Sequence, residues 1–167
     1  MTVRKQPPAR KPRRNEDDAT DHAILAALER DGRLSYADLA DAVDLSKTAT
    51  WGRVRDLEGR RVIAGYRAEI APAAVGLDIH AFVQVTIKST LYEQFEHSVL
   101  RHPAVLECYT TAGQADYLLH VLVADVGTLD TLLRTEISQM PGVERISTTV
   151  GLKTIKHRGL IMPCVRR

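Results

Sequence analysis

The second half of the sequence is an internal repeat, and such a repeat leaves few folds open to the chain. From His80 onward, residues recur at an offset of 38 positions, so that Val83 and Val85 correspond to Val121 and Val123. Further matched pairs are Leu91 with Leu129, Phe95 with Leu133, Val99 with Ile137, Pro103 with Pro141 and Val105 with Val143. Each copy has the pattern of a strand, a helix and a strand. Two such units in tandem predict a ferredoxin-like βαββαβ fold, in which both helices cover one face of a four-stranded antiparallel sheet.

One predicted strand of this sheet is apolar on both of its faces. Residues 117–123 are all apolar except His120. Such a strand needs cover on both faces, whereas the two helices cover only one. We expect Phe82, Leu118 and Leu122 on the face that the helices leave open. A second copy of the same sheet is the economical cover, so the pattern predicts a symmetric homodimer.

The first half of the sequence has helical periodicity instead. A helix predicted from about Thr20 to Arg30 is followed by two short helices, whose N-caps are Ser35 and Ser46. The turn before Ser46 needs a left-handed residue, and Asp44 tolerates that conformation better than most. Three short helices around one apolar seam, two of them joined by a tight turn, are typical of a helix-turn-helix domain.

The last of these helices has a polar and basic side. Thr50, Val54 and Leu57 face the seam, and a short basic helix of this kind fits the major groove of duplex DNA. The candidate DNA-binding residues are Ser46, Lys47, Thr48, Trp51, Arg53 and Arg55. Because Asp56 and Glu58 offset part of this charge, a helical bundle with a solvated charged face is the alternative interpretation.

Residues 1–18 form a basic segment without apolar periodicity. Its cations, interleaved with prolines, are Arg4, Lys5, Arg10, Lys11, Arg13 and Arg14. Such a segment cannot bury enough apolar surface to offset its ordering entropy, so we predict that it is disordered. It either adds phosphate or minor-groove contacts, as basic arms do, or serves only as a solubilising tail.

Composition and motifs exclude several other classes of protein. A formal net charge of +2 does not by itself demand a nucleic-acid partner. No apolar run is long enough for a membrane span or a secretory signal, so no membrane partner is expected. Cys108 and Cys164 have no metal-ligand spacing and suit a reducing cytoplasm. The sequence contains no nucleophile elbow and no phosphate loop, so we predict no catalytic residue, no metal site and no cofactor.

A loop between the second and third predicted strands carries groups that suit a small effector. Gly113 lets backbone amides approach a carboxylate, and Asp116 is able to hold an ammonium group. These are the groups that an α-amino acid needs. The candidate effector-binding residues are Thr111, Ala112, Gly113, Gln114, Asp116 and Tyr117. Ordinary turn chemistry is the alternative for a Gly and an Asp in a hairpin.

Short motifs in both halves add a family resemblance. In the first half they are Ile24-Leu25, Gly32-Arg33-Leu34-Ser35, Leu45-Ser46, Arg53-Val54-Arg55, Leu57-Glu58, Val62-Ile63 and Gly65-Tyr66. In the second half they are Glu107-Cys108-Tyr109, Gly113, Asp116-Tyr117-Leu118-Leu119 and Pro141-Gly142-Val143. In this order and spacing the sequence resembles the Lrp/AsnC (feast/famine) family of transcription regulators, from about Thr20 to Pro163.

The resemblance implies an α+β protein with an N-terminal helix-turn-helix (winged-helix-like) domain and a C-terminal ferredoxin-like sensing domain. It also implies a palindromic DNA operator, an amino acid or similar small molecule as effector, and homodimers that assemble further to octamers. The expected organisation is a disordered basic tail at 1–18, the DNA-binding domain at 19–63, a hinge strand and linker at 64–79, the effector-binding and dimerisation domain at 80–154, and a C-terminal extension at 155–167.

Four residues depart from the family pattern on or just after the DNA-reading helix. Lys47 stands where the family usually has Pro, and Arg61 stands where it usually has Gly. A left-handed Arg61 costs about 1 kcal/mol, unless Gly59 ends the helix earlier. Gly52 weakens the helix by about 1 kcal/mol relative to Ala. Trp51 either packs inward against the first helix, the placement we favour, or lies against a base or sugar.

Two alternative functions fit the same architecture. Siroheme decarboxylases resemble it and use His and Arg in a porphyrin pocket, and here His80 and His120 fall on neighbouring predicted strands. A pure effector-binding or assembly module with a degenerate helix-turn-helix is the other. We predict a cytoplasmic DNA-binding transcriptional regulator that responds to a small effector, rather than an enzyme.

Overall fold

The structure, a computed structural model, describes residues 16–157 and 159–165. The chain forms two compact units. One runs to Ala68 and includes the C-terminal residues after His157, and the other is Glu69–His157. Positions 1–15 of the predicted tail therefore lie outside the described residues. The last three positions of the tail, 16–18, belong to the first helix.

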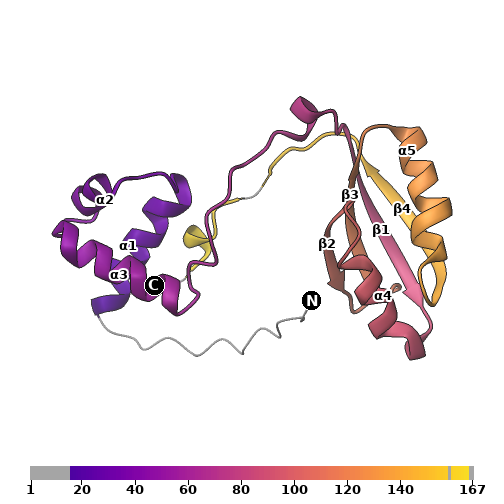
Figure 1. The fold of residues 1–167 in the computed structure, drawn as a ribbon, viewed down its shortest axis with the longest axis horizontal. Helices are drawn as coiled ribbons and strands as arrows, with labels where there is room; N and C mark the ends of the chain where they lie inside the picture. Colours follow the sequence, from indigo (N-terminus) through magenta and orange to yellow (C-terminus); the bar gives the residue numbers. More distant parts are fainter. Residues whose placement is uncertain (1–15, 158, 166–167) are drawn as a thin grey trace. The chain divides into compact units, whose positions relative to one another are not determined.

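The N-terminal unit is built from three helices, α1 (Glu16–Arg30), α2 (Tyr36–Ala42) and α3 (Lys47–Gly59) (Figure 1). Helix α1 starts about one turn before the Thr20 predicted from the sequence. Ile24, Leu39, Val54 and Leu57 form the core at this helix junction. Thr50 is buried with them, and its hydroxyl donates to the carbonyl of Ser46 at 3.1 Å, which satisfies its polar group.

The caps and turns of this unit follow the sequence signals. The Ser35 and Ser46 side chains accept hydrogen bonds from the backbone N–H groups of Asp38 and Ala49, both at 3.2 Å. Asp44 is left-handed, with φ of 53°, as predicted. No strand follows α3 among the described residues of this unit, so this chain alone forms no wing.

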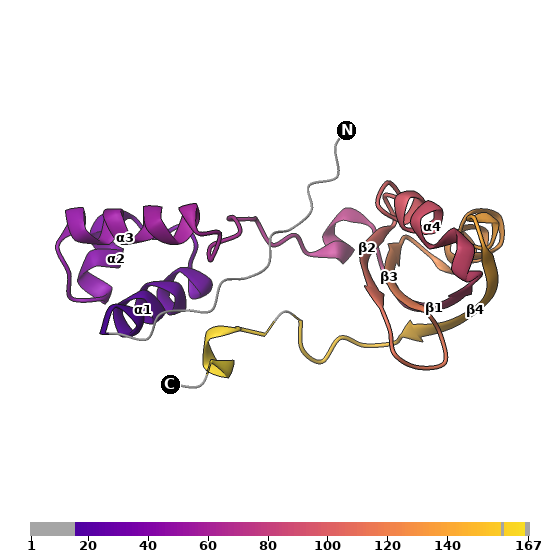
Figure 2. The ribbon, with the colours of Figure 1, turned by 90° about the horizontal axis from the view of Figure 1, so that it is seen from below.

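The C-terminal unit has the predicted ferredoxin-like topology. Its elements are β1 (Ile79–Ile87), α4 (Tyr92–Val99), β2 (Val105–Thr110), β3 (Tyr117–Val123), α5 (Val126–Thr131) and β4 (Val143–Gly151). The antiparallel sheet has the order β2-β3-β1-β4, and α4 and α5 lie on one of its faces (Figures 1 and 2). Alternate residues of β1 are buried under these helices, including Val83 and Val85.

The second helix of the repeat is less regular than the first. After α5 the chain continues as a π-helical turn, Leu132–Glu136, and a 3-10 turn, Ile137–Gln139. A π turn holds one extra residue and rotates the following side chains. For this reason Leu132 is buried beside Leu129 and Ile137, whereas Leu133, the sequence counterpart of Phe95, is only partly buried.

The other face of the sheet carries the expected apolar residues, which differ in exposure. Phe82 is 41% exposed, and Leu118 is half-buried. Leu122 also lies on this face, as predicted, but it is only 8% exposed. The alternation of β3 places Leu122 on the face opposite to Val121, which belongs to the core under the helices.

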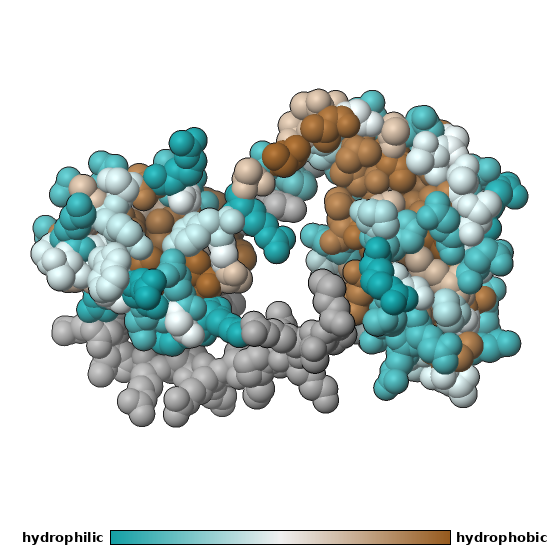
Figure 3. All heavy atoms as spheres, in the orientation of Figure 1, coloured by the Kyte–Doolittle hydropathy of each residue, from teal (hydrophilic) through white to brown (hydrophobic). Residues whose placement is uncertain are grey.

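The two segments that connect the units are largely irregular. Residues 64–71 form no paired strand, and a 3-10 turn, Pro72–Val75, follows. A strand needs a hydrogen-bonding neighbour, and within the described residues the expected hinge strand has none. Ile70 and Val75 are exposed, and Figure 3 shows apolar surface at this turn.

The end of the chain returns to the N-terminal unit. Glu29 on α1 accepts hydrogen bonds from the backbone N–H groups of Ile161 at 2.5 Å and Met162 at 2.9 Å. A 3-10 turn, Met162–Cys164, follows. The predicted C-terminal extension at 155–167 is therefore divided, because its described residues after position 157 belong to the N-terminal unit.

Candidate DNA-binding and effector sites

Helix α3 presents its polar side to solvent at its N-terminal end. Ser46, Lys47, Thr48, Trp51 and Arg55 are all exposed, as a DNA-reading surface requires. The first turn contains no acidic residue. The positive end of the helix dipole and Lys47 therefore act together, and both favour a phosphate group.

Trp51 does not pack inward, so the favoured placement of this side chain was wrong. It is 50% exposed, and the guanidinium carbon of Arg55 lies 5.5 Å from the centre of its ring. With Tyr36, Lys47 and Thr48 it lines a shallow cavity of about 230 Å³. Tyr36 was missed as a member of this surface. The sequence signal that could have identified Tyr36 is its position as an aromatic residue directly after the Ser35 cap.

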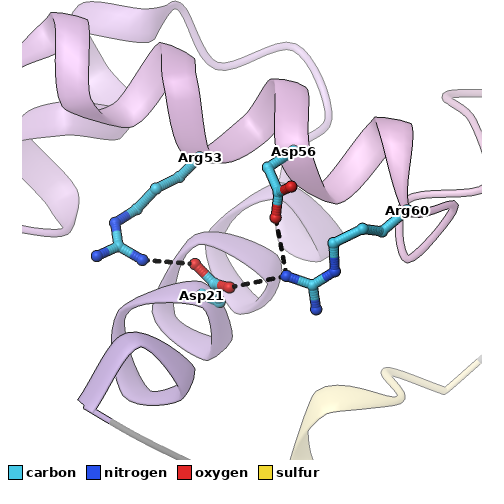
Figure 4. A network of polar contacts seen from close by, with 4 residues as sticks. All are labelled: Asp21, Arg53, Asp56 and Arg60. Atoms are coloured by element: carbon cyan, nitrogen blue, oxygen red, sulfur yellow. Dashed lines mark hydrogen bonds and ion pairs between the residues drawn. The ribbon is translucent and has the colours of Figure 1, made fainter. Parts of the chain in front are cut away.

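The structure separates Arg53 from the other candidate DNA-binding residues. Its guanidinium donates to the Asp21 carboxylate on α1 at 2.9 Å (Figure 4). Arg60 contacts the same carboxylate at 3.7 Å and Asp56 at 2.8 Å. Asp21 is 13% exposed, so this network is partly shielded from water and braces α3 against α1. Arg53 contributes to this brace.

The predicted effector loop is closed at its base by hydrogen bonds. Thr111 donates its backbone N–H to the carbonyl of Asp116 at 2.9 Å and its hydroxyl to Ala115 at 2.5 Å. Residues 111–114 are exposed and Asp116 is half-buried. Gly113 does not have a positive φ, and a Cβ there would meet nothing within 4 Å. The space beside Gly113 is therefore open.

Asp116 already has partners within the chain. One carboxylate oxygen accepts the backbone N–H of Ile87 at 2.9 Å, and the other accepts the Tyr92 hydroxyl at 3.5 Å. An ionised carboxylate has about four acceptor positions, so both bonds leave capacity for a further donor. Arg145 donates to the carbonyl of Gln114 at 3.2 Å, which places a cation beside the loop.

Tyr117 lies apart from the rest of this loop, because its side chain belongs to the core. It is 3% exposed and packs on Phe95, with ring centres 4.8 Å apart. Its hydroxyl donates to Glu96 at 2.7 Å. Burial and the nearby Glu96 carboxylate raise the pKa of the Tyr117 hydroxyl far above its usual value, so it stays protonated.

His80 and His120 meet on the sheet face opposite the helices, as their neighbouring strands predicted. Their ring nitrogens are 3.1 Å apart, and His120 also stacks on Phe82 with ring centres 4.9 Å apart. Burial lowers the pKa of His120, against the opposing effect of the Glu107 carboxylate at 3.7 Å. Among the described residues, no three His, Cys, Asp or Glu side chains are grouped so that they could hold a metal ion.

A braced helix-turn-helix joined to a ferredoxin-like unit defines a class of two-domain DNA-binding proteins that carry a regulatory domain. Two family models match the chain in the same order. An AsnC-type helix-turn-helix domain matches residues 18–58, and an Lrp/AsnC ligand binding domain matches residues 80–161. The chain belongs to the Lrp/AsnC family.

Sequence relatives of known role support the same assignment. The Bkd operon transcriptional regulator of Pseudomonas aeruginosa is 36% identical over 146 residues, which is 86% of this chain and 95% of that protein. The leucine-responsive regulatory protein of Haemophilus influenzae is 34% identical over 148 residues, covering 87% of this chain and 89% of that protein.

Solved structures share the fold over most of the chain. A transcriptional regulator of Neisseria meningitidis in complex with L-Met has a TM-score of 0.82 and 31% identity, covering 84% of this chain and 93% of that one. Escherichia coli AsnC has a TM-score of 0.80 and 25% identity, covering 85% and 96%. This protein is a DNA-binding transcriptional regulator that responds to a small effector. No helix among its described residues has the length and apolar character needed to cross a bilayer.

Proposed function

We propose that the effector is an α-amino acid bound at the loop of residues 111–116. The observation that carries this proposal is the position of Asp116, a half-buried carboxylate at the base of an exposed loop. Its remaining acceptor capacity suits an ammonium group, and the exposed backbone around Gly113 suits a carboxylate. The Neisseria structure with L-Met supports the same class of ligand.

The proposed DNA-binding form is a homodimer on a palindromic operator. The second copy covers the sheet face that carries Phe82, Leu118 and His120, since a half-apolar face of this kind is stabilised by burial. Two-fold symmetry then presents two copies of α3 to half-sites about one helical turn apart. Such dimers assemble further to octamers. As a DNA-binding regulator, the protein acts in the cytoplasm.

The proposed mechanism is a population shift between assembly or dimer geometries. An amino acid that binds one geometry more tightly favours it by the difference in binding free energy. The spacing of the two α3 helices, and with it the affinity for the operator, changes accordingly. No catalytic step is part of this mechanism.

The effector proposal is tested by thermal-shift measurements with each of the twenty amino acids, followed by Asp116→Asn. This variant removes the charge while its amide oxygen still accepts from Ile87. Glu144→Gln is the matched control, because it removes an exposed carboxylate on β4 outside the loop. We expect the stabilising amino acid to lose affinity only for Asp116→Asn. Equal affinities for both variants would place the effector elsewhere.

Operator binding is tested by gel shifts on the chain's own promoter region at several salt concentrations. Binding to phosphates weakens linearly with the logarithm of the salt concentration. Arg55→Ala is expected to weaken operator binding and leave the dimer intact. An absorbance titration with a tetrapyrrole addresses the enzyme alternative, because the half-buried His80–His120 pair lies on the sheet face that the helices leave open. A Soret shift there would contradict a purely regulatory function.

A further inference from the structure

Three arginines on or directly after helix α3, namely Arg53, Arg55 and Arg60, have different partners. Arg53 and Arg60 contact Asp21 on α1. Arg55 makes no ion pair among residues 16–157 and 159–165, and its guanidinium lies over the ring of Trp51 instead. The two cations bound to α1 are held beside that helix, whereas Arg55 is on the exposed side.

Trp51 and Arg55 are four positions apart on a helix, so their side chains project from the same face. A helical side chain leans toward the N-terminus, which brings the guanidinium of Arg55 back over the indole. The indole also lines the shallow cavity with Tyr36 and Thr48. Trp51 therefore restricts where the end of the Arg55 side chain lies.

A guanidinium that lies over an aromatic ring keeps N–H donors available to another partner. The ring interacts with one flat face through its π electrons, whereas the donors point outward in the plane. An arginine held in this way matches the two major-groove acceptors of guanine, O6 and N7, by two parallel hydrogen bonds. An unrestrained arginine has to lose more conformational freedom to make the same contact.

We propose that Trp51 is a positioning residue that presents Arg55 to a guanine in each operator half-site. The inference rests on the proposed operator binding by α3 and specifies which base the helix reads. It also accounts for a tryptophan that is half exposed on a reading surface, a position that gains little from burial.

The test uses the full chain and an operator selected from random DNA duplexes. Each guanine of that operator is replaced in turn by 7-deazaguanine, which lacks N7 but keeps Watson–Crick pairing. We expect one guanine per half-site at which this change weakens wild-type binding about tenfold. A guanine outside the half-sites is the internal control.

Four variants then locate the contact. Arg55→Ala and Arg55→Lys are expected to reduce the 7-deazaguanine penalty to about twofold or less, because neither offers a planar pair of donors. Trp51→Leu is expected to reduce the penalty while Arg55 is still present, and Trp51→Phe is expected to retain most of it because a ring remains. Circular dichroism verifies that each variant is folded.

The measured quantity is a ratio of affinities for two DNAs, which a general loss of stability does not change. A full penalty in Trp51→Leu overturns the positioning role of Trp51. If Trp51→Leu does not fold, an equal 7-deazaguanine penalty in wild type and in Arg55→Lys overturns the contact between Arg55 and guanine. A selection that yields no preferred duplex overturns the proposed operator binding itself, and so is distinguishable from both.

Discussion

Arg61 is a residue at which a single substitution is expected to stabilise the protein. It follows the end of α3 with φ of 59°, in the left-handed region. Its N–H donates to the carbonyl of Glu58 at 3.0 Å, and the N–H of Val62 donates to that of Leu57 at 2.9 Å. This pair of bonds is a Schellman motif, in which the left-handed position is usually Gly. Helix α3 ends at Gly59, and Arg61 is left-handed nevertheless.

The size of the effect follows from two opposing contributions. A left-handed L-residue costs about 1–2 kcal/mol, and Arg61→Gly removes this cost. Glycine adds flexibility to the unfolded chain, which takes back about 0.5–1 kcal/mol. The net gain in the free energy of unfolding is about 0.5–1 kcal/mol, or about 2–8 °C in Tm for a unit of this size.

The fluorescence of Trp51, the only tryptophan, reports on this unit during urea unfolding. The matched control is Arg61→Ala, which also deletes the side chain but keeps the Cβ that causes the strain. We expect a higher urea midpoint for Arg61→Gly and no gain for Arg61→Ala. Equal gains in both variants would refute the reasoning, because the side chain rather than the backbone would then be responsible.

Three further predictions concern other positions. Gly142→Ala should destabilise the C-terminal unit by about 2–3 kcal/mol in thermal unfolding, since φ is 80° and the new Cβ would lie 2.8 Å from Cβ of Leu91; a loss below about 0.5 kcal/mol would contradict it. Ser46→Ala should lower the stability of the N-terminal unit by about 1 kcal/mol in urea, whereas Ser46→Asp should retain the cap, and equal stability of both would count against the cap. Because the pKa of His120 is lowered in the folded state, its neutral form contributes stability that is fully present above about pH 6.5 and lost as the pH falls through the folded pKa. The free energy of unfolding, measured from pH 7.5 to 5, should therefore fall more steeply in wild type than in His120→Gln. Parallel curves would exclude this role of His120.

Local interactions determined much of this protein from sequence alone. The caps at Ser35 and Ser46 and the left-handed Asp44 depend on groups only a few residues away, so short-range patterns identify them. The repeat identified the sheet and its helices because alternation and helical spacing report which side of each element is buried. For the same reason, the pairing of His80 with His120 followed from strand order.

Tertiary structure decided which candidate side chains share a surface. Arg53 looks like Arg55 in the sequence, yet Asp21, 32 positions away, draws it to α1. Trp51 is exposed although its apolar ring suits a core, because Ile24, Leu39, Val54 and Leu57 already form the helix junction. The hydrogen bonds from residues 161 and 162 to Glu29 join positions that are 132 and 133 residues apart in the sequence. No local pattern encodes such contacts, because they depend on which surfaces remain available after the elements have packed.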